Sequence, residues 1–290
     1  MFFFLIGLLV MLLLVLQAVA FLTLLERHLL GGSQCRIGPN KVGFGGILQA
    51  VFDGLKLVKK EQVLLSGSSF FVFLWVPVMG FLAMVLVWFV LDFYFEFLSF
   101  KFSGVFLLCV MSFFVFPVML SGVFSGSKYS FLGGLRSTVQ SFSYEIAFSL
   151  FFLCLLLCWS DLLLFKGFLW VSFFIFFCML FFVLVDLHRA PFDFSECESE
   201  LVSGYNVEYS SVGFAILFLG EYGNIIFFCC LLSCLFFDFS FLVIYVLLFF
   251  VIFSRSAYPR FRFDKLMSIC WLLFLPLGVY FLGFYLFILL

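Results

Sequence analysis

The long uncharged stretches of this chain limit its fold more than any other feature. The first 25 residues carry no charged side chain, and the first charge is Glu26. A run of about 18 apolar residues is already long enough to mark a membrane span. Of all 290 residues, 66% are hydrophobic and 11% are charged, and the mean hydropathy is +1.32. Because a soluble domain has no place for so much apolar surface, the sequence predicts an all-α, polytopic membrane protein.

About eight transmembrane helices are expected, within a single integral membrane domain that covers residues 1–290. The expected spans are residues 1–25, 70–91, 103–124, 139–160, 168–186, 209–236, 239–254 and 268–290. The segment 45–60 differs, because Val51, Leu55 and Val58 recur on one helical face while Asp53 and Lys56 lie off it. This pattern predicts an amphipathic helix that lies in the membrane interface.

The basic residues predict how the chain is oriented in the membrane. Loops after the first, third, fifth and seventh spans hold all but two of the 15 Lys and Arg residues, the exceptions being Lys101 and Lys166. By the positive-inside rule, these odd loops face the side of synthesis and both termini face the opposite side. A secretory signal would carry basic residues before its apolar core, but no basic residue precedes the first apolar run of this chain. We therefore expect the chain to insert from the compartment in which it is made.

A cluster of acids lies between two of the expected spans. Residues 186–208 read DLHRAPFDFSECESELVSGYNVE. The acids in this stretch are Asp186, Asp193, Glu196, Glu198, Glu200 and Glu208. Carboxyl groups this close titrate as a coupled set, which favours a role as a proton antenna. Calcium binding is an alternative, but the DxDxDG spacing of a calcium loop is absent.

Two further acids fall inside expected spans. Glu145 lies several residues into the span 139–160, and Glu221 lies about halfway through the span 209–236. A charge at the bilayer centre costs roughly 2.5–3.5 kcal/mol on translocon-insertion scales, and acids at such positions usually belong to proton or ion pathways. The alternative is a protonated Glu that only hydrogen-bonds a neighbouring helix.

Each of two basic stretches allows two interpretations, and the cysteines argue against a metal site. Residues 26–46 are either a solvated basic loop or the wall of a pocket for an electron-rich headgroup. Residues 254–267, SRSAYPRFRFDKLM, are either a membrane anchor or a docking surface for a soluble partner. The 10 cysteines form no CxxC pair, so we expect no metal or iron–sulfur site within the chain.

Several motifs together resemble one family. The matching runs include ERHLLG, RIGPN, GGLRSTVQSFSYE, PFDFSECESELVSGYNVEY and AYPRFRFDKLM, and they extend over residues 26–267. They are similar to those of the quinone-chamber membrane subunit of respiratory complex I, which occurs in mitochondria and, as a counterpart, in bacteria. At Asp186 the chain carries a shorter acid than the family's Glu, and His28 stands where Lys is common.

The resemblance implies a function for most of these residues. It implies a core membrane subunit of a proton-pumping NADH:quinone oxidoreductase, in the mitochondrial inner membrane with both termini on the intermembrane-space side. The quinone-site residues it implies are Glu26, Arg27, Arg36, Asp53, Lys56 and Phe192. The proton-coupling residues it implies are Glu145, Asp186, Glu196, Glu198, Glu200, Glu208 and Glu221. The residues suggested to dock partner subunits are Arg189, Arg260, Arg262 and Asp264.

The resemblance also implies cofactors and partners. The chain itself would hold no redox centre: quinone is the substrate, and the iron–sulfur clusters and flavin belong to partner subunits. The expected partners are hydrophilic quinone-site subunits, adjacent small membrane subunits, ubiquinone or a related quinone, and lipids, with no nucleic acid. The alternatives are the membrane subunit of an energy-converting hydrogenase, a stand-alone ion or proton transporter, and a simple anchor for soluble subunits.

Overall fold

The computed structural model describes residues 2–63, 69–91, 102–159, 173–195, 198–237 and 239–289, and its described residues contain helices and no strands. The long helices are α1 (Phe2–Ser33), α3 (Phe70–Trp88), α4 (Ser103–Phe124), α5 (Lys128–Trp159), α6 (Phe173–Asp186), α8 (Ser211–Phe237), α9 (Phe241–Ala257) and α11 (Leu275–Leu289). The shorter elements are η1 (Phe44–Gly46), α2 (Ile47–Lys59), α7 (Glu198–Leu201), η4 (Gly204–Asn206), α10 (Phe263–Ser268) and the π-helical η5 (Ile269–Phe274).

Every expected span has a counterpart among these helices. In the described residues, six helices are long and apolar enough to cross a membrane, and the apolar helices α6 and α9 are shorter. The polytopic all-α fold is therefore confirmed. The beginning of the span expected at 168–186 lies outside the described residues, so that only its part from Phe173 onward can be compared.

Three helices extend further than the hydropathy pattern predicted. Helix α1 continues to Ser33, so Glu26 and Arg27 lie on the helix and not in a loop. Helix α5 already begins at Lys128, and α10, η5 and α11 together continue the last span back to Phe263. Polar residues end a hydropathy window without ending a helix, because backbone hydrogen bonds continue wherever neighbouring helices or water accommodate the side chains.

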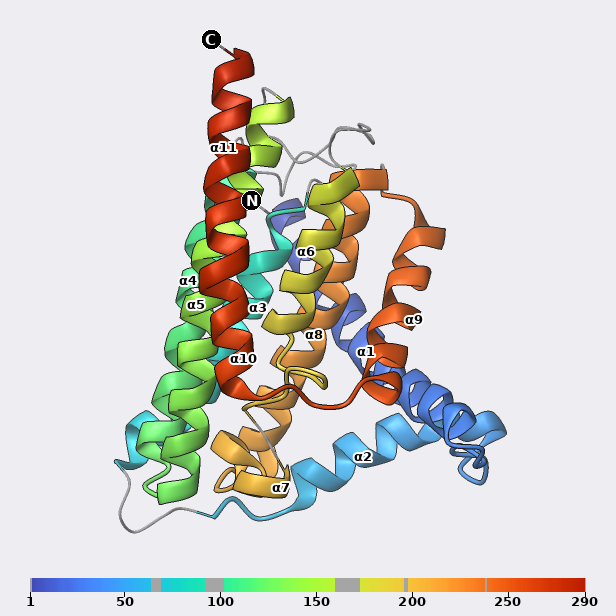
Figure 1. The fold of residues 1–290 in the computed structure, drawn as a ribbon. Coiled ribbons are helices and arrows are strands. Elements are labelled where there is room, and N and C mark those ends of the chain that lie inside the picture. The colour runs from blue at the N-terminus through green and yellow to red at the C-terminus, as the bar shows by residue number, and fades with distance from the viewer. Residues whose placement is uncertain are drawn as a thin grey trace.

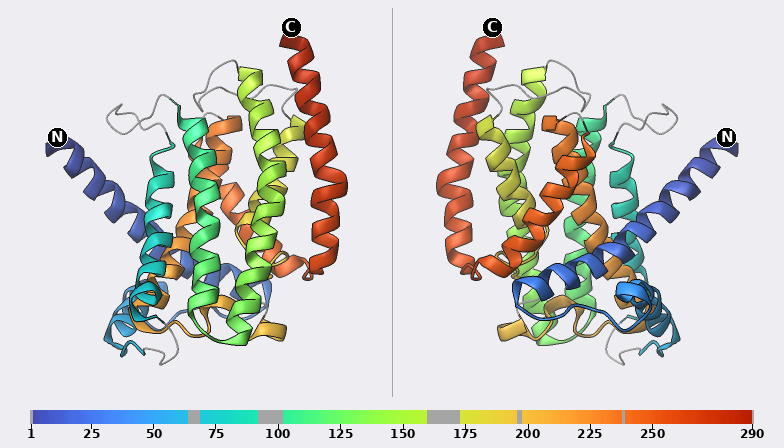
Figure 2. Two further views of the ribbon diagram at one scale, coloured as in Figure 1. Left: turned by 90° about the vertical axis from the view of Figure 1, so that its left-hand side faces the viewer. Right: turned by 90° about the vertical axis from the view of Figure 1, so that its right-hand side faces the viewer.

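The bundle has two different ends (Figure 1). Helices α2 and α7 lie at one end, and both chain termini lie toward the other. Figure 2 shows that α1 leaves the bundle obliquely, and its outer half exposes Leu9, Leu13 and Leu14. Helix α8 lies inside the bundle and packs against α1, α3, α6 and α9. The loops after the first, third, fifth and seventh spans thus gather at one end of the bundle, as the charge pattern predicted.

The amphipathic helix α2 is held by its two ends. Most of its apolar residues, including Val51, Leu55 and Val58, are exposed to the surroundings. At its C-terminus, the Ser211 hydroxyl donates to the Lys60 carbonyl oxygen at 2.7 Å. At its start, Gly46 has a φ of 74°, and a Cβ there would lie 2.7 Å from the carbonyl oxygen of Pro39. This arrangement fits a helix that rests on a membrane surface.

Candidate functional site

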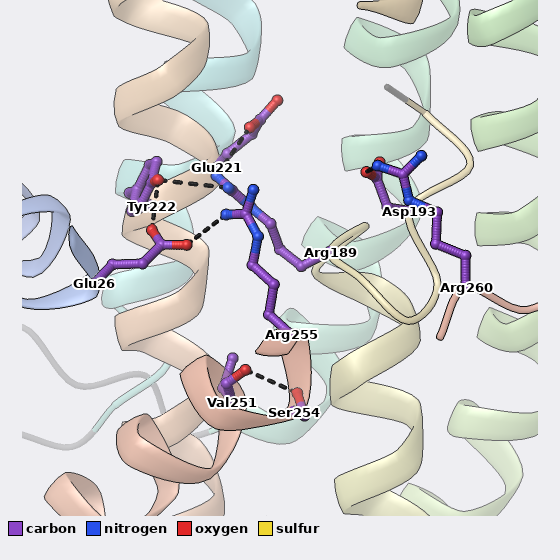
Figure 3. Close-up of polar contacts among 9 residues, drawn as sticks. All are labelled: Glu26, Arg189, Asp193, Glu221, Tyr222, Val251, Ser254, Arg255 and Arg260. Atoms are coloured by element: carbon purple, nitrogen blue, oxygen red, sulfur yellow. Dashed lines mark hydrogen bonds and ion pairs between the residues drawn. The ribbon is translucent and has the colours of Figure 1, made fainter. Parts of the chain in front are cut away.

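A chain of charged and hydroxyl groups joins α1, α9, α8 and the segment after α6 (Figure 3). Glu26 on α1 is buried, and its carboxylate accepts hydrogen bonds from Arg255 on α9 at 2.5 Å and from the Tyr222 hydroxyl on α8 at 2.6 Å. Arg189 donates to the same hydroxyl at 3.4 Å. The Tyr222 hydroxyl therefore connects Glu26 to Arg189.

Arg189 joins this chain to Glu221. Its guanidinium lies 3.5 Å from the Glu221 carboxylate and 4.4 Å from the centre of the Tyr222 ring. Tyr205 donates a hydrogen bond to the other Glu221 oxygen, and the Asn206 amide lies 3.4 Å from it. Two arginines thus balance two glutamates in this network. A buried charge is tolerated when it is paired and hydrogen-bonded in this way.

Glu221 also lines a cavity of about 70 Å³, which Glu26 does not line. Its polar lining residues come from α5, α6, α8 and the segments between them, and they include Ser141, Tyr144, Asp186, His188, Ser195, Tyr205, Glu221 and Asn224. Helix α4 contributes only the apolar side chains Phe114, Val115 and Val118. The cavity therefore joins two of the predicted proton-coupling acids, Asp186 and Glu221.

The cavity wall near Asp186 is fixed by hydrogen bonds from α5. The Tyr144 hydroxyl donates to the Asp186 carboxylate. One turn earlier on α5, the amide of the fully buried Gln140 donates to the carbonyl oxygens of Val185 at 2.8 Å and Phe192 at 3.1 Å. These two bonds connect α5 to the end of α6 and to the loop after it, in addition to the backbone N–H groups of His188 and Phe194 that also donate to these carbonyl oxygens.

Other acids of the 186–208 segment pair with bases from elsewhere in the chain. Asp193 is buried, and its carboxylate lies 3.3 Å from Arg260. Exposed Glu200 on α7 lies 2.5 Å from Arg136 on α5. Gly133 on α5 and Gly204 on η4, shortly after α7, approach closely, since a Cβ on Gly133 would lie 2.8 Å from the Gly204 Cα. This close approach lets α5 lie against the segment that carries α7 and η4.

Two other predicted coupling residues, Glu145 and Glu208, are not among the described residues that line the cavity. Glu145 is half-buried on α5, and Glu208 is half-buried before α8. Glu196 lies outside the described residues, and only the backbone of Glu198 is described, at the start of α7. Their coupling roles stay predictions.

The predicted quinone-site residues fall into separate places. Arg27 and Asp53 form a half-exposed ion pair of 2.7 Å that connects α1 to α2. Arg36 is exposed and donates to the Gln34 side chain at 2.8 Å, and Lys56 is exposed on α2. Phe192 is buried and packs its ring on Phe181 and Phe261. The structure thus groups Arg27, Asp53 and Lys56 at α2, whereas Glu26 belongs to the buried network.

The predicted docking residues also divide into two kinds. Arg262 and Asp264 are exposed, while Arg260 pairs with Asp193. Arg189 is buried and points into the bundle, where it contacts Tyr222 and Glu221. These surroundings favour a role for Arg189 in holding Glu221 over a role in docking. Among the described residues, no group of three or more His, Cys, Asp or Glu side chains is placed to hold a metal ion.

Comparison with known proteins identifies the family. A sequence model described as NADH dehydrogenase matches residues 6–286. The chain belongs to this family. Proteins named NADH-ubiquinone oxidoreductase chain 1 are similar to it along nearly their whole length. The one from Aedes aegypti is 40% identical over 298 residues, which cover 97% of this chain and 94% of that protein.

Two further relatives carry the same name. The chain 1 protein of Heterololigo bleekeri is 44% identical over 279 residues, covering 90% of this chain and 89% of that protein. The one from Chondrus crispus is 38% identical over 292 residues, covering 91% and 90% respectively. The resemblance drawn from the motifs is therefore confirmed at the level of the family.

Several residues of the network were not predicted from the sequence of this family member. Tyr144, Tyr205 and Tyr222 donate to Asp186, Glu221 and Glu26, and Arg136 and Arg255 supply the balancing charges. A buried tyrosine needs a partner for its hydroxyl. That requirement was a usable signal, because the chain has only 10 Tyr residues against 53 Phe.

Proposed function

We propose that this chain is a core membrane subunit of a proton-translocating NADH:quinone oxidoreductase, in which it helps to enclose the quinone and couples quinone reduction to proton transfer. The observation that carries this proposal is the position of Glu221. Its carboxylate lies between a balanced network of arginines and tyrosines and a polar cavity that also contains Asp186. Such an acid has charged and hydroxyl partners on one side, and it lines a polar cavity from which a proton can reach it.

The quinone is assigned to the end of the bundle that carries α2. There, the Arg27–Asp53 pair, Arg36 and Lys56 offer charged groups beside the exposed apolar face of α2. An apolar surface suits an isoprenoid tail, and cations suit the electron-rich headgroup. Together with Glu26 and Phe192, these residues would form the entrance and floor of a chamber that partner subunits complete.

The chemistry assigned to this chain is proton transfer and electrostatics. The electrons reach the quinone from flavin and iron–sulfur clusters in hydrophilic partner subunits. Reduction of the quinone adds negative charge, and charge in a low-dielectric environment changes the proton affinity of nearby acids strongly. The network connects Glu26 to Glu221, and the cavity connects Glu221 to Asp186. A change of charge at the quinone can therefore change the proton affinity of all three acids.

The further steps of the coupling route also belong to the proposal. Glu145, Glu196, Glu198, Glu200 and Glu208 would pass the change to adjacent membrane subunits. Half-buried Glu145 follows Tyr144 directly, so a charge on Asp186 lies close to it in the fold. The exposed Arg262 and Asp264 would face the soluble partners, with Arg260, which pairs with Asp193, beside them. The proposed location is the mitochondrial inner membrane, with both termini in the intermembrane space.

Replacement of Glu221 by Gln tests this function in the assembled enzyme. Gln can still hydrogen-bond Tyr205 and Arg189, but it carries no exchangeable acid proton. We expect NADH oxidation by an artificial acceptor to stay unchanged, and quinone reduction and proton pumping to fall about a hundredfold. Glu61→Gln is the matched control, because Glu61 is an exposed acid outside the network. If the Glu221→Gln enzyme pumps protons like the wild type, the proposed role of Glu221 is wrong and the chain acts as an anchor for soluble subunits.

A further inference from the structure

The cavity beside Glu221 contains unsatisfied polar atoms that none of the steps above uses. Within the described part of the chain, His188 Nδ1 and Asn224 Oδ1 are sealed from solvent and lack a hydrogen-bond partner, and both residues line this cavity. A buried polar atom without a partner costs free energy of about 1–3 kcal/mol. A water molecule in a polar cavity removes this cost when it finds two to four polar partners.

The size and lining of the cavity favour water inside it. Its volume is about 70 Å³, and a water molecule occupies about 30 Å³ in the liquid. Hydroxyl groups of Ser141, Ser195 and Tyr205 line it together with the two acids. The cavity therefore has room and hydrogen-bonding partners for at least two waters between Asp186 and Glu221.

His188 is the one titratable nitrogen on this wall of described residues. It follows α6 directly, two residues after Asp186, and its φ of 47° turns the chain sharply there. The titratable groups that face the cavity are Tyr144 from α5, Asp186 from α6, Tyr205 from η4 and Glu221 from α8, while α4 adds only apolar residues. Apart from the imidazole, each of these groups loses a proton to become charged.

We propose that His188 is a further proton-carrying residue of this chain, which receives a proton through water from one of the two cavity acids and passes it on to the other. The step rests on the proposed function of Glu221. A proton leaves one carboxylic acid and reaches His188 Nδ1, so that a carboxylate and an imidazolium form. The imidazolium then returns a proton to water, and the second carboxylate accepts it.

The surroundings of His188 suit a transient carrier. Burial lowers the pKa of His188 to about 4, so the imidazole is neutral at neutral pH. A neutral ring accepts on one nitrogen and donates from the other. An imidazolium in the cavity is stabilised only while a carboxylate faces it. The ring therefore gains a proton when an acid ionises and loses it when that acid is protonated again.

Replacement of His188 by Asn tests this inference. Asn keeps a donor and an acceptor but does not titrate. We expect His188→Asn enzyme to assemble and to oxidise NADH with an artificial acceptor normally. Proton pumping coupled to quinone reduction should fall about tenfold, less than for a sole acid–base group, because water bypasses the ring. The solvent deuterium isotope effect on quinone reduction should rise as well, because proton transfer becomes limiting.

Val118→Ala is the control for altered packing, since it changes an apolar wall of the same cavity and removes no polar group. The inference is overturned if His188→Asn behaves like Val118→Ala in both pumping and isotope effect. It is also overturned if His188→Asn and His188→Gln both fail to assemble, because the ring would then be structural. Loss of pumping in Glu221→Gln with full pumping in His188→Asn would leave the proposed function intact and remove only this step.

Discussion

Glu26 on α1 and Arg255 on α9 are 229 residues apart in the sequence, yet their charged atoms lie 2.5 Å apart. The Glu26 side chain is almost completely buried, whereas that of Arg255 reaches the surface. The pair joins the helix that leaves the bundle obliquely to the helix before the loop 258–262. The stability of the bundle and the charge of the proposed coupling network therefore depend on the same contact.

Removal of Arg255 should expose this dependence. Arg255→Met leaves the Glu26 carboxylate buried with the Tyr222 hydroxyl as its one remaining partner among the described residues, which we expect to destabilise the subunit by about 1–3 kcal/mol. Thermal denaturation of the assembled enzyme measures this effect. The double variant Glu26→Gln with Arg255→Met should recover much of the loss. An unchanged midpoint in Arg255→Met would mean that the pair contributes nothing.

Arg36 should affect quinone and not NADH. Arg36→Ala removes an exposed cation near α2, and we expect the apparent KM for a short-chain quinone to rise roughly fivefold, equivalent to about 1 kcal/mol. Lys41→Ala, another exposed cation of the same loop, is the control. Steady-state kinetics with quinone and with an artificial acceptor separate the two activities. A parallel fall in both would make the loop an assembly element.

Gln140 should hold the loop after α6 in place. Gln140→Leu removes the side-chain donor from the carbonyl oxygens of Val185 and Phe192 and leaves each with one backbone N–H donor, at an expected cost of about 1 kcal/mol. Hydrogen exchange of the segment 187–195 should become faster in the variant. Thr138→Val is the control on the same helix, because the Thr138 hydroxyl bonds only the Leu135 carbonyl oxygen among the described groups. Equal exchange in both variants would contradict this role.

The ends of α4 and α5 should be accessible from opposite sides of the membrane. Phe102 precedes α4 and Lys128 begins α5, and both are exposed. Single cysteines at these positions, after Cys35 and Cys109 are replaced by Ser, should react with an impermeant reagent from different compartments. Labelling of both from one side would refute the predicted topology.

Acid should destabilise the subunit through His188. Its pKa is about 4 in the fold and about 6.5 in the unfolded chain. Between these values the unfolded state binds the extra proton, so this contribution to stability is complete above pH ~6.5 and is lost as the pH falls toward ~4. The loss amounts to about 3 kcal/mol. Because other acids of the subunit respond to pH as well, the measurement compares melting temperatures of wild type and His188→Asn across pH. Identical pH profiles would show that the ring is solvated.

The sequence determined the class of fold, the approximate spans and the family. A membrane span can be recognised from the length of an apolar run alone, because a span must match the thickness of the bilayer. Motifs such as PFDFSECESELVSGYNVEY identify the family without any coordinates. The acids Asp186 and Glu221 also stand out by themselves, since a carboxyl group in an apolar span is costly wherever it points.

Only the tertiary structure decided which groups meet. The partners of Glu26 lie 196 and 229 residues away, and no periodicity in the sequence reports contacts between helices. The same holds for Arg136 with Glu200 and for the cavity that His188 lines together with Asp186 and Glu221. The number of charges in a segment is fixed by composition, but their pairing depends on how the helices pack, and pairing is what makes a buried charge tolerable.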